Sequence, residues 1–173
     1  MRGFTLVELL IVIAVMGILT GIGLTSFTFT IQKSRDAKRK SDLTLISKAI
    51  VAWAGDFGGY PDDDGTGRFL ACDPSNSFKT TGVFNVCNWG GALSAFTNDG
   101  FQTYLAKIPA EPQGSFKYYY KKSTDGFSLF SILENTSDPD YKADAGEEDF
   151  GAGVIKCGTT QNCNYQVTES GKK

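Results

Sequence analysis

The order of apolar and polar positions divides this chain into two very different parts. From Leu9 to Ile31 the sequence runs without a single charged residue. A helix needs about 20 consecutive apolar residues to cross the hydrocarbon core of a bilayer. We therefore expect residues 4–31 to form a helix that lies in a membrane or in an equally apolar protein environment.

Beyond this segment the helical pattern continues, now with one apolar face. The apolar positions recur every three or four residues, as on one side of a helix: Leu43, Ile46, Ile50, Trp53 and Phe57. Charged side chains lie off this stripe in the sequence pattern: Asp36, Lys40, Asp42 and Lys48. The pattern ends at Gly58-Gly59-Tyr60-Pro61, a strong stop signal. One helix from Thr5 to about Asp56 is therefore predicted, with residues 32–57 packed on a head formed by residues 58–173.

A small antiparallel sheet is predicted in this head. Phe116–Lys121 is rich in the aromatic residues that favour strands, and Phe127–Leu133 follows it after the turn signal Ser123–Gly126. Val154-Ile155 and Tyr165-Gln166-Val167 are expected to add edge strands. The predicted fold class is α+β, a long N-terminal helix followed by an antiparallel sheet.

The segment between helix and sheet gives weaker signals. Residues 62–110 contain several turn motifs and are expected to be rich in loops. A short helix is predicted at Phe101–Ala106. Trp89 and Phe96 are assigned to the core of the head rather than to a ligand platform.

One acidic residue interrupts the start of the apolar segment. An ionisable group in the hydrocarbon costs about 2.5–3.5 kcal/mol on insertion scales, so Glu8 needs a partner and a role. If the chain is cut between Gly3 and Phe4, the new amine of Phe4 lies one helical turn from Glu8. That amine is also a cationic partner for Glu8 of a neighbouring copy, and each charge then offsets the other's desolvation.

The run from Arg2 to Val12, with Gly3, Phe4 and Glu8 in it, resembles the N-terminal signature of type IV pilins. It is equally similar to that of the pseudopilins of type II secretion and competence systems. The resemblance is close over residues 2–31 and looser over 32–60.

This resemblance carries several implications. Residues 1–3 would be a leader that a membrane prepilin peptidase removes, after which Phe4 is N-methylated. Glu8, opposite the Phe4 amine, would set the axial register of subunits in a filament. The implied partners are further copies of the chain, the pilus assembly machinery and, before assembly, the membrane.

A basic run follows the apolar segment: Lys33, Arg35, Lys38, Arg39 and Lys40. The positive-inside rule would place the following residues in the cytoplasm. The pilin resemblance places the head outside the cytoplasmic membrane. Unassembled subunits would be single-pass membrane proteins, and assembled subunits would lie in a filament on the cell surface. We follow the resemblance. The run could also bind DNA or anionic lipid, but basic residues without interleaved aromatics are a weak nucleic-acid signal. A solvated helix face that pairs with acidic residues of neighbouring subunits is preferred.

Composition narrows the chemistry. The 173 residues hold 17 Lys and Arg, 19 Asp and Glu, and no histidine. The absence of histidine excludes histidine-based triads and zinc sites with histidine ligands. Neither a nucleophile elbow nor a P-loop occurs, and we expect no enzyme.

Four cysteines occur, without C-x-x-C spacing: Cys72, Cys87, Cys157 and Cys163. An even number in a chain destined for the outside favours disulfides, of which three pairings exist. The sequence-local pairs Cys72–Cys87 and Cys157–Cys163 are preferred, and free buried thiols are the alternative.

One acidic stretch is a metal candidate: Asp138, Asp140, Asp144, Glu147 and Asp149. Calcium prefers several flexible oxygen ligands. The placement is similar to that of the calcium-binding loop of major pseudopilins, although the spacing is not that of an EF-hand. A solvated acidic loop is the alternative to calcium.

Together, these features predict the structural subunit of a type IV pilus-like filament. The alternatives are a major pseudopilin of a secretion or competence system, or a minor pilin that acts as a membrane-anchored binding module. Gly59-Tyr60-Pro61 and the acidic stretch favour the pseudopilin, and the four cysteines favour a pilin exposed outside the cell.

Overall fold

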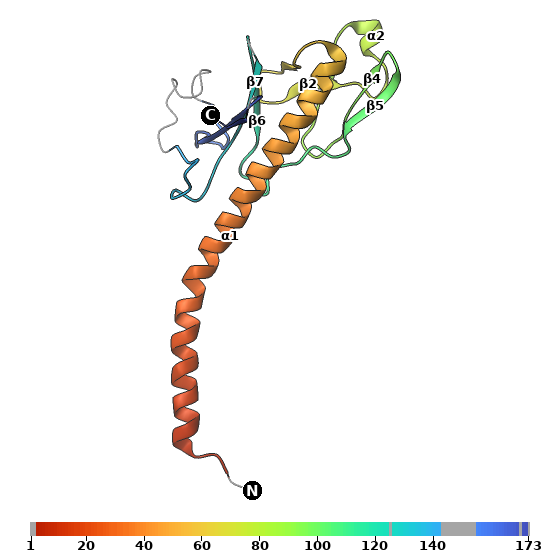
Figure 1. Ribbon diagram of the computed structural model, residues 1–173. Helices are drawn as coiled ribbons and strands as arrows, with labels where there is room; N and C mark the ends of the chain where they lie inside the picture. Colours follow the sequence, from red (N-terminus) through yellow and green to blue (C-terminus); the bar gives the residue numbers. More distant parts are fainter. Residues whose placement is uncertain (1–2, 125, 143–154, 170, 173) are drawn as a thin grey trace.

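The computed structural model describes residues 3–124, 126–142, 155–169 and 171–172, without the side chains of residues 22–26 and 171–172. Its elements are, in chain order, α1 (Leu6–Phe57), β1 (Asp62–Asp63), β2 (Phe69–Cys72), α2 (Phe78–Thr81), β3 (Asn85–Val86), β4 (Leu93–Thr97), β5 (Gly100–Leu105), β6 (Tyr119–Ser123), β7 (Gly126–Ser131), β8 (Tyr165–Thr168) and β9 (Gly171–Lys172). The predicted α+β class is confirmed. Figure 1 shows α1 as a long rod whose first half extends away from a head built around its second half.

The bounds of α1 agree with the prediction to within one residue. Thr5 is the N-cap, and Gly58 is the C-cap with φ of 76°. The Gly58 N–H donates to the carbonyl of Ala54 at 2.8 Å. Glycine suits this place because a left-handed backbone costs it little, and the bond satisfies a carbonyl that the helix end would leave unpaired. No helix in the described part of the chain is both long enough and apolar enough to cross a membrane.

The apolar stripe of α1 is the centre of the head core, as predicted. Leu43, Ile46 and Ile50 are fully buried, and Trp53 is nearly so. They share one core with Tyr118, which precedes β6, and with residues from three sheets: Phe69, Ala71, Leu93, Tyr120, Phe127, Leu129 and Val167. Burial of a side chain of this size contributes about 1.5–3 kcal/mol, so the stripe fixes the head on the helix.

The main sheet has the antiparallel order β6-β7-β8-β9. The predicted hairpin forms its first pair, with Tyr119 opposite Phe130 and Ser123 opposite Gly126. The prediction for Tyr165–Val167 is right in type and wrong in place: β8 is not an edge strand, because it pairs with both β7 and β9. Ile155 lies outside the strands, and Val154 lies outside the described residues.

The helix predicted at Phe101–Ala106 is wrong. Those residues form most of β5, which pairs with β4 in a second hairpin. Gly100, with φ of 121°, allows the tight turn after β4, and the rings of Phe96 and Phe101 face each other across the strands at 5.0 Å. Aromatic cross-strand pairing outweighs the weak helical pattern here. Phe96 therefore belongs to this hairpin, whereas Trp89 packs against the head core as predicted.

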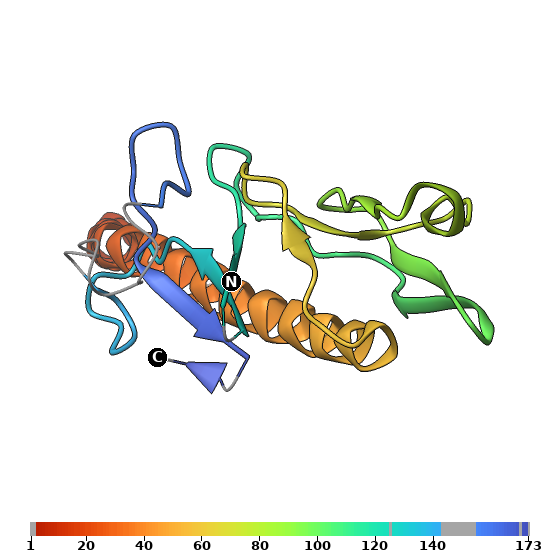
Figure 2. The same ribbon diagram turned by 90° about the horizontal axis from the view of Figure 1, so that it is seen from above.

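The segment 62–110 is more regular than expected, since it also contains the three-stranded sheet β1-β2-β3. Seen from above, the green hairpin β4–β5 lies nearer the C-terminal end of α1 than the teal and blue strands of the main sheet (Figure 2). The head therefore covers the second half of α1 and leaves the first half uncovered.

Candidate functional site

The predicted cleavage position lies just before α1. Met1 and Arg2 are outside the described residues. Gly3 and Phe4 lie in an irregular exposed segment, and Phe4 is 90% exposed. Exposed, non-helical backbone is where proteases cut most readily. The placement of the Gly3–Phe4 bond suits processing, and cleavage itself stays a prediction.

Glu8 is turned back towards the start of its own helix. Its Oε2 accepts hydrogen bonds from the Thr5 backbone N–H at 2.9 Å and from the Thr5 hydroxyl at 2.8 Å. In return, the Glu8 N–H donates to Thr5 Oγ1 at 3.3 Å. This reciprocal pair is a capping box, which places a carboxylate at the positive end of the helix dipole.

Thr5 is the residue that the sequence analysis missed at this site. The spacing Thr-x-x-Glu is a known signature of a helix start, and it was visible in the sequence. The sequence prediction pairs Glu8 only with the Phe4 amine. Within one chain the carboxylate of Glu8 is already held by Thr5, and its pairing with an amine stays a prediction.

The apolar residues after Glu8 lie exposed on the described surface. Leu9 is 62% exposed, Ile18 is 65% exposed, and further large side chains along this half of α1 are also exposed. Soluble monomers rarely expose contiguous apolar surface on this scale, and such surface marks contacts with other proteins or with lipid. The described side chains in the first half of α1 therefore form a candidate interaction surface.

Further along α1, after the apolar residues, a buried ion-pair cluster attaches the helix to the head. The Arg39 side chain is fully buried. Its Nε donates to Glu111 at 2.5 Å, and its Nη1 donates to Glu134 at 2.6 Å and to Asp36 at 2.7 Å. Arg35 adds a two-pronged pair with Glu134, in which Nε lies 2.8 Å from Oε1.

Backbone bonds complete the cluster. The carboxylate of Asp36 accepts the N–H of Glu134 at 3.0 Å and that of Asn135 at 2.8 Å. Burial alone would raise the pKa of Glu134, but hydrogen bonds from Arg35 and Arg39 lower it below its usual value. These contacts hold the chain after β7 against the helix, and they favour the ionised form of Glu134.

The expectation of a solvated basic face is wrong for most of the run. Arg39 and Asp36 are buried, although the sequence pattern placed Asp36 off the packed face. The acidic partners come from the head of the same chain, because Glu111 and Glu134 lie directly over this turn of α1. Lys38 remains exposed, without an ion pair in the described part of the chain.

Lys40 bears on the calcium prediction. Its Nζ lies 2.5 Å from Asp138 Oδ1 and 2.7 Å from Asp140 Oδ2, and it sits 5.6 Å from the centre of the Tyr165 ring. Burial opposes ionisation of Asp138, but the hydrogen bond from Lys40 lowers its pKa.

Two of the five proposed calcium ligands, Asp138 and Asp140, are therefore already paired with one ammonium group. The other three lie outside the described residues: Asp144, Glu147 and Asp149. Among the described residues, no group of three or more acidic or cysteine side chains is arranged to hold a metal ion. Calcium binding stays a prediction.

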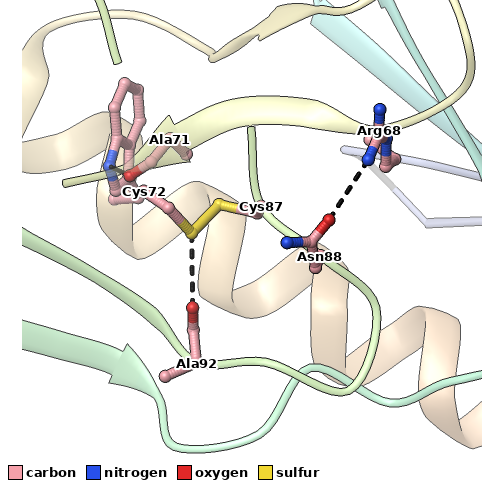
Figure 3. Close-up of a disulfide and its surroundings, with 7 residues drawn as sticks. Arg68, Ala71, Cys72, Cys87, Asn88 and Ala92 are labelled. Atoms are coloured by element: carbon pink, nitrogen blue, oxygen red, sulfur yellow. Dashed lines mark hydrogen bonds between the residues drawn. A yellow bond between two sulfur atoms is a disulfide. The ribbon is translucent and has the colours of Figure 1, made fainter. Parts of the chain in front are cut away.

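Both predicted disulfides are confirmed. Cys72 is bonded to Cys87 and Cys157 to Cys163, with Cα–Cα distances of 5.2 Å and 5.0 Å. Figure 3 shows the first bridge joining β2 to the chain after β3, with Cys72 Sγ 3.3 Å from the carbonyl oxygen of Ala92. The bridges tie down loops that have few core residues of their own.

Comparison with known proteins matches the N-terminal segment to a family model. Residues 1–24 match the model described as the prokaryotic N-terminal methylation motif. No solved structure matches at a significant level.

Two curated relatives match most of the chain. The type II secretion system core protein G of Pseudomonas aeruginosa is 29% identical over 152 residues, which is 85% of this chain and 94% of that protein. The fimbrial protein EcpC of Eikenella corrodens is 26% identical over 144 residues, which is 80% of this chain and 94% of that protein. In its methylation motif, its long N-terminal helix and its antiparallel head, this chain is similar to type IV pilins and to the pseudopilins of type II secretion systems.

Proposed function

We propose that this chain is the structural subunit of a type IV pilus-like filament. In this proposal the precursor sits in the cytoplasmic membrane with its head outside, and it is cut between Gly3 and Phe4 and N-methylated at Phe4. It then polymerises into an extracellular filament. The observation that carries the proposal is the exposed apolar half of α1, which is continuous with a helix packed firmly in the head.

In this proposal the first half of α1 moves between two apolar environments, the lipid bilayer and the filament core. Each large aliphatic side chain contributes about 1.5–3 kcal/mol when it is fully buried, and this half of α1 exposes many of them. Lipid buries them before assembly, and the same halves of neighbouring copies bury them in the filament. The head stays rigid in both states because its core does not include this half of the helix.

Glu8 supplies the register in this proposal. Both hydrogen bonds from Thr5 go to Oε2, so Oε1 is available for the Phe4 amine of a neighbouring copy. A charge pair in an apolar core is strongly favoured over two unpaired charges. Because the contact joins two different surfaces and does not close, repeating it generates a filament rather than a ring.

The test compares two carboxylate variants in cells. Glu8→Val removes the register charge and is expected to leave subunits in the membrane, with no filaments in electron micrographs of sheared material. Asp99→Asn changes an exposed carboxylate in the β4–β5 turn and should leave filaments normal. Mass spectrometry of wild-type filaments should find a chain that begins at methylated Phe4. Normal filaments from Glu8→Val, or a mature chain that keeps residues 1–3, would refute the proposal.

The second candidate is a major pseudopilin, which the similarity to the type II secretion core protein G favours. Deletion of the gene separates the two. A pilus subunit is required for filaments on the cell surface at native expression, whereas a pseudopilin is required for export of secreted proteins without such filaments. A minor pilin, as a membrane-anchored binding module, would instead be present in filaments in far fewer copies than the major subunit.

A further inference from the structure

A cavity of about 630 Å³ lies at the C-terminal end of α1, far from the cleavage position. It is bordered by the end of α1, by the chain leading into β1, by α2 and by the β4–β5 hairpin. Its volume falls in the range of about 300–1,000 Å³ that is typical of small-molecule sites. Neither the assembly surface nor the ion-pair cluster uses it.

Aromatic rings form one wall of this cavity. Trp53 stacks on Phe57 with ring centres 4.4 Å apart, and Phe84 meets both rings edge-on at 4.9–5.0 Å. Phe78 stacks on Phe84 at 4.0 Å. Phe57, Phe78 and Phe84 are only partly buried, so ring surface remains open to a ligand. The π face of an aromatic ring attracts cations.

The charges around the cavity also favour a cation. The last turn of α1 carries no basic residue, and it contains Asp56 at the negative end of the helix dipole. Asp56 accepts a hydrogen bond from the Tyr104 hydroxyl at 2.5 Å and makes no ion pair within the described residues. Asp62 also lines the cavity, but it is paired with Lys122 at 2.7 Å. Lys79 is the one basic side chain in the described lining, and it is exposed.

We propose that this cavity binds a compact organic cation, an alkylammonium group, between the aromatic wall and the Asp56 carboxylate. Either a free quaternary ammonium compound or the lysyl side chain of a polypeptide presents this chemistry. Anions are disfavoured because the helix terminus and Asp56 both present negative potential. The inference does not depend on filament assembly.

The test uses the full chain in maltoside micelles, with ligand binding measured by saturation-transfer NMR. Choline is the first probe, and its uncharged isostere 3,3-dimethylbutan-1-ol is the matched control for shape. Nα-acetyl-lysine methylamide is the second probe, and it distinguishes a polypeptide source from a free quaternary ammonium source. We expect saturable binding of at least one cation, and at least tenfold weaker binding of the isostere.

Two variants locate the site. Phe84→Leu keeps an apolar side chain but removes one π face, and Asp56→Asn keeps an acceptor for Tyr104 while removing the charge. Each should weaken cation binding by about threefold to thirtyfold, the range for cation–π and charge contacts of about 0.7–2 kcal/mol. Phe27→Leu changes an exposed ring in the first half of α1, outside the cavity lining, and should leave binding unchanged. Equal binding of the isostere, no saturable binding of either cation, or unchanged affinity in Asp56→Asn would overturn the proposal.

Discussion

Replacing Arg39 by methionine tests whether the buried ion-pair cluster holds α1 in the head. The guanidinium donates to three carboxylates at 2.5–2.7 Å, and it is fully buried. Removing one partner of a buried pair typically costs about 3–5 kcal/mol, because the remaining charges lose their compensation. Glu134 keeps its pair with Arg35, and Asp36 keeps two backbone donors, so we expect a loss within that range rather than beyond it. For a chain of this size the loss corresponds to a melting temperature lower by about 6–20 °C.

Urea unfolding of the full chain in detergent, followed by tryptophan fluorescence, measures this loss. Lys38→Met is the matched control, because Lys38 lies one residue away on the exposed side of the helix. The free energy of unfolding of this variant should differ from that of wild type by less than about 0.5 kcal/mol.

The pH dependence of stability gives a second readout. The pKa of Glu134 is lowered in the folded chain, so its stabilising contribution is present above the unfolded value of about 4.3 and is lost as the pH falls through the lower folded value. The difference in the free energy of unfolding between wild type and Arg39→Met should therefore become smaller below about pH 4. Equal stability of Arg39→Met and Lys38→Met at pH 7 would refute the reasoning.

Three further predictions follow from other parts of the chain. The double variant Cys72→Ser with Cys87→Ser should lose about 3 kcal/mol, the loop-closure value for a separation of 15 residues; an unchanged urea midpoint under oxidising conditions would contradict this. Asp64 accepts hydrogen bonds from Thr66 and Arg68, and although burial opposes ionisation, these lower its pKa to about 2. Asp64→Asn should therefore destabilise the chain by about 1–2 kcal/mol at pH 7, and the difference should shrink as the pH falls from about 4 to 2; a difference that does not depend on pH would argue against this assignment. Calcium at the acidic stretch predicts a melting temperature that falls on addition of EDTA, and an identical temperature with EDTA or with millimolar calcium would dismiss that prediction.

The long helix and its packing stripe were predictable because both depend on local pattern. Leu43 to Phe57 repeat with the period of a helix, and Gly58 supplies the stop. The disulfide pairs were predictable because they close short loops in sequence. The capping role of Thr5 is also predictable, because the spacing Thr5-x-x-Glu8 is a local signature of a helix start.

The ion-pair cluster could not be predicted from sequence alone. Glu111 and Glu134 lie far from Arg39 in the chain, and only the fold brings them over the same helical turn. A periodicity argument counts a charged residue as solvent-facing, so it placed Asp36 on the wrong side. The β5 strand was misassigned for a similar reason, since the pairing of Phe101 with Phe96 across the turn decides its conformation.

The most direct test of the account is a cryo-electron microscopy reconstruction of sheared wild-type filaments. The account predicts that residues 4–31 of many copies pack together along the filament axis, with the Glu8 carboxylate of one copy beside the Phe4 amine of the next. A filament whose axis is formed by the heads, with this half of α1 facing solvent, would contradict it.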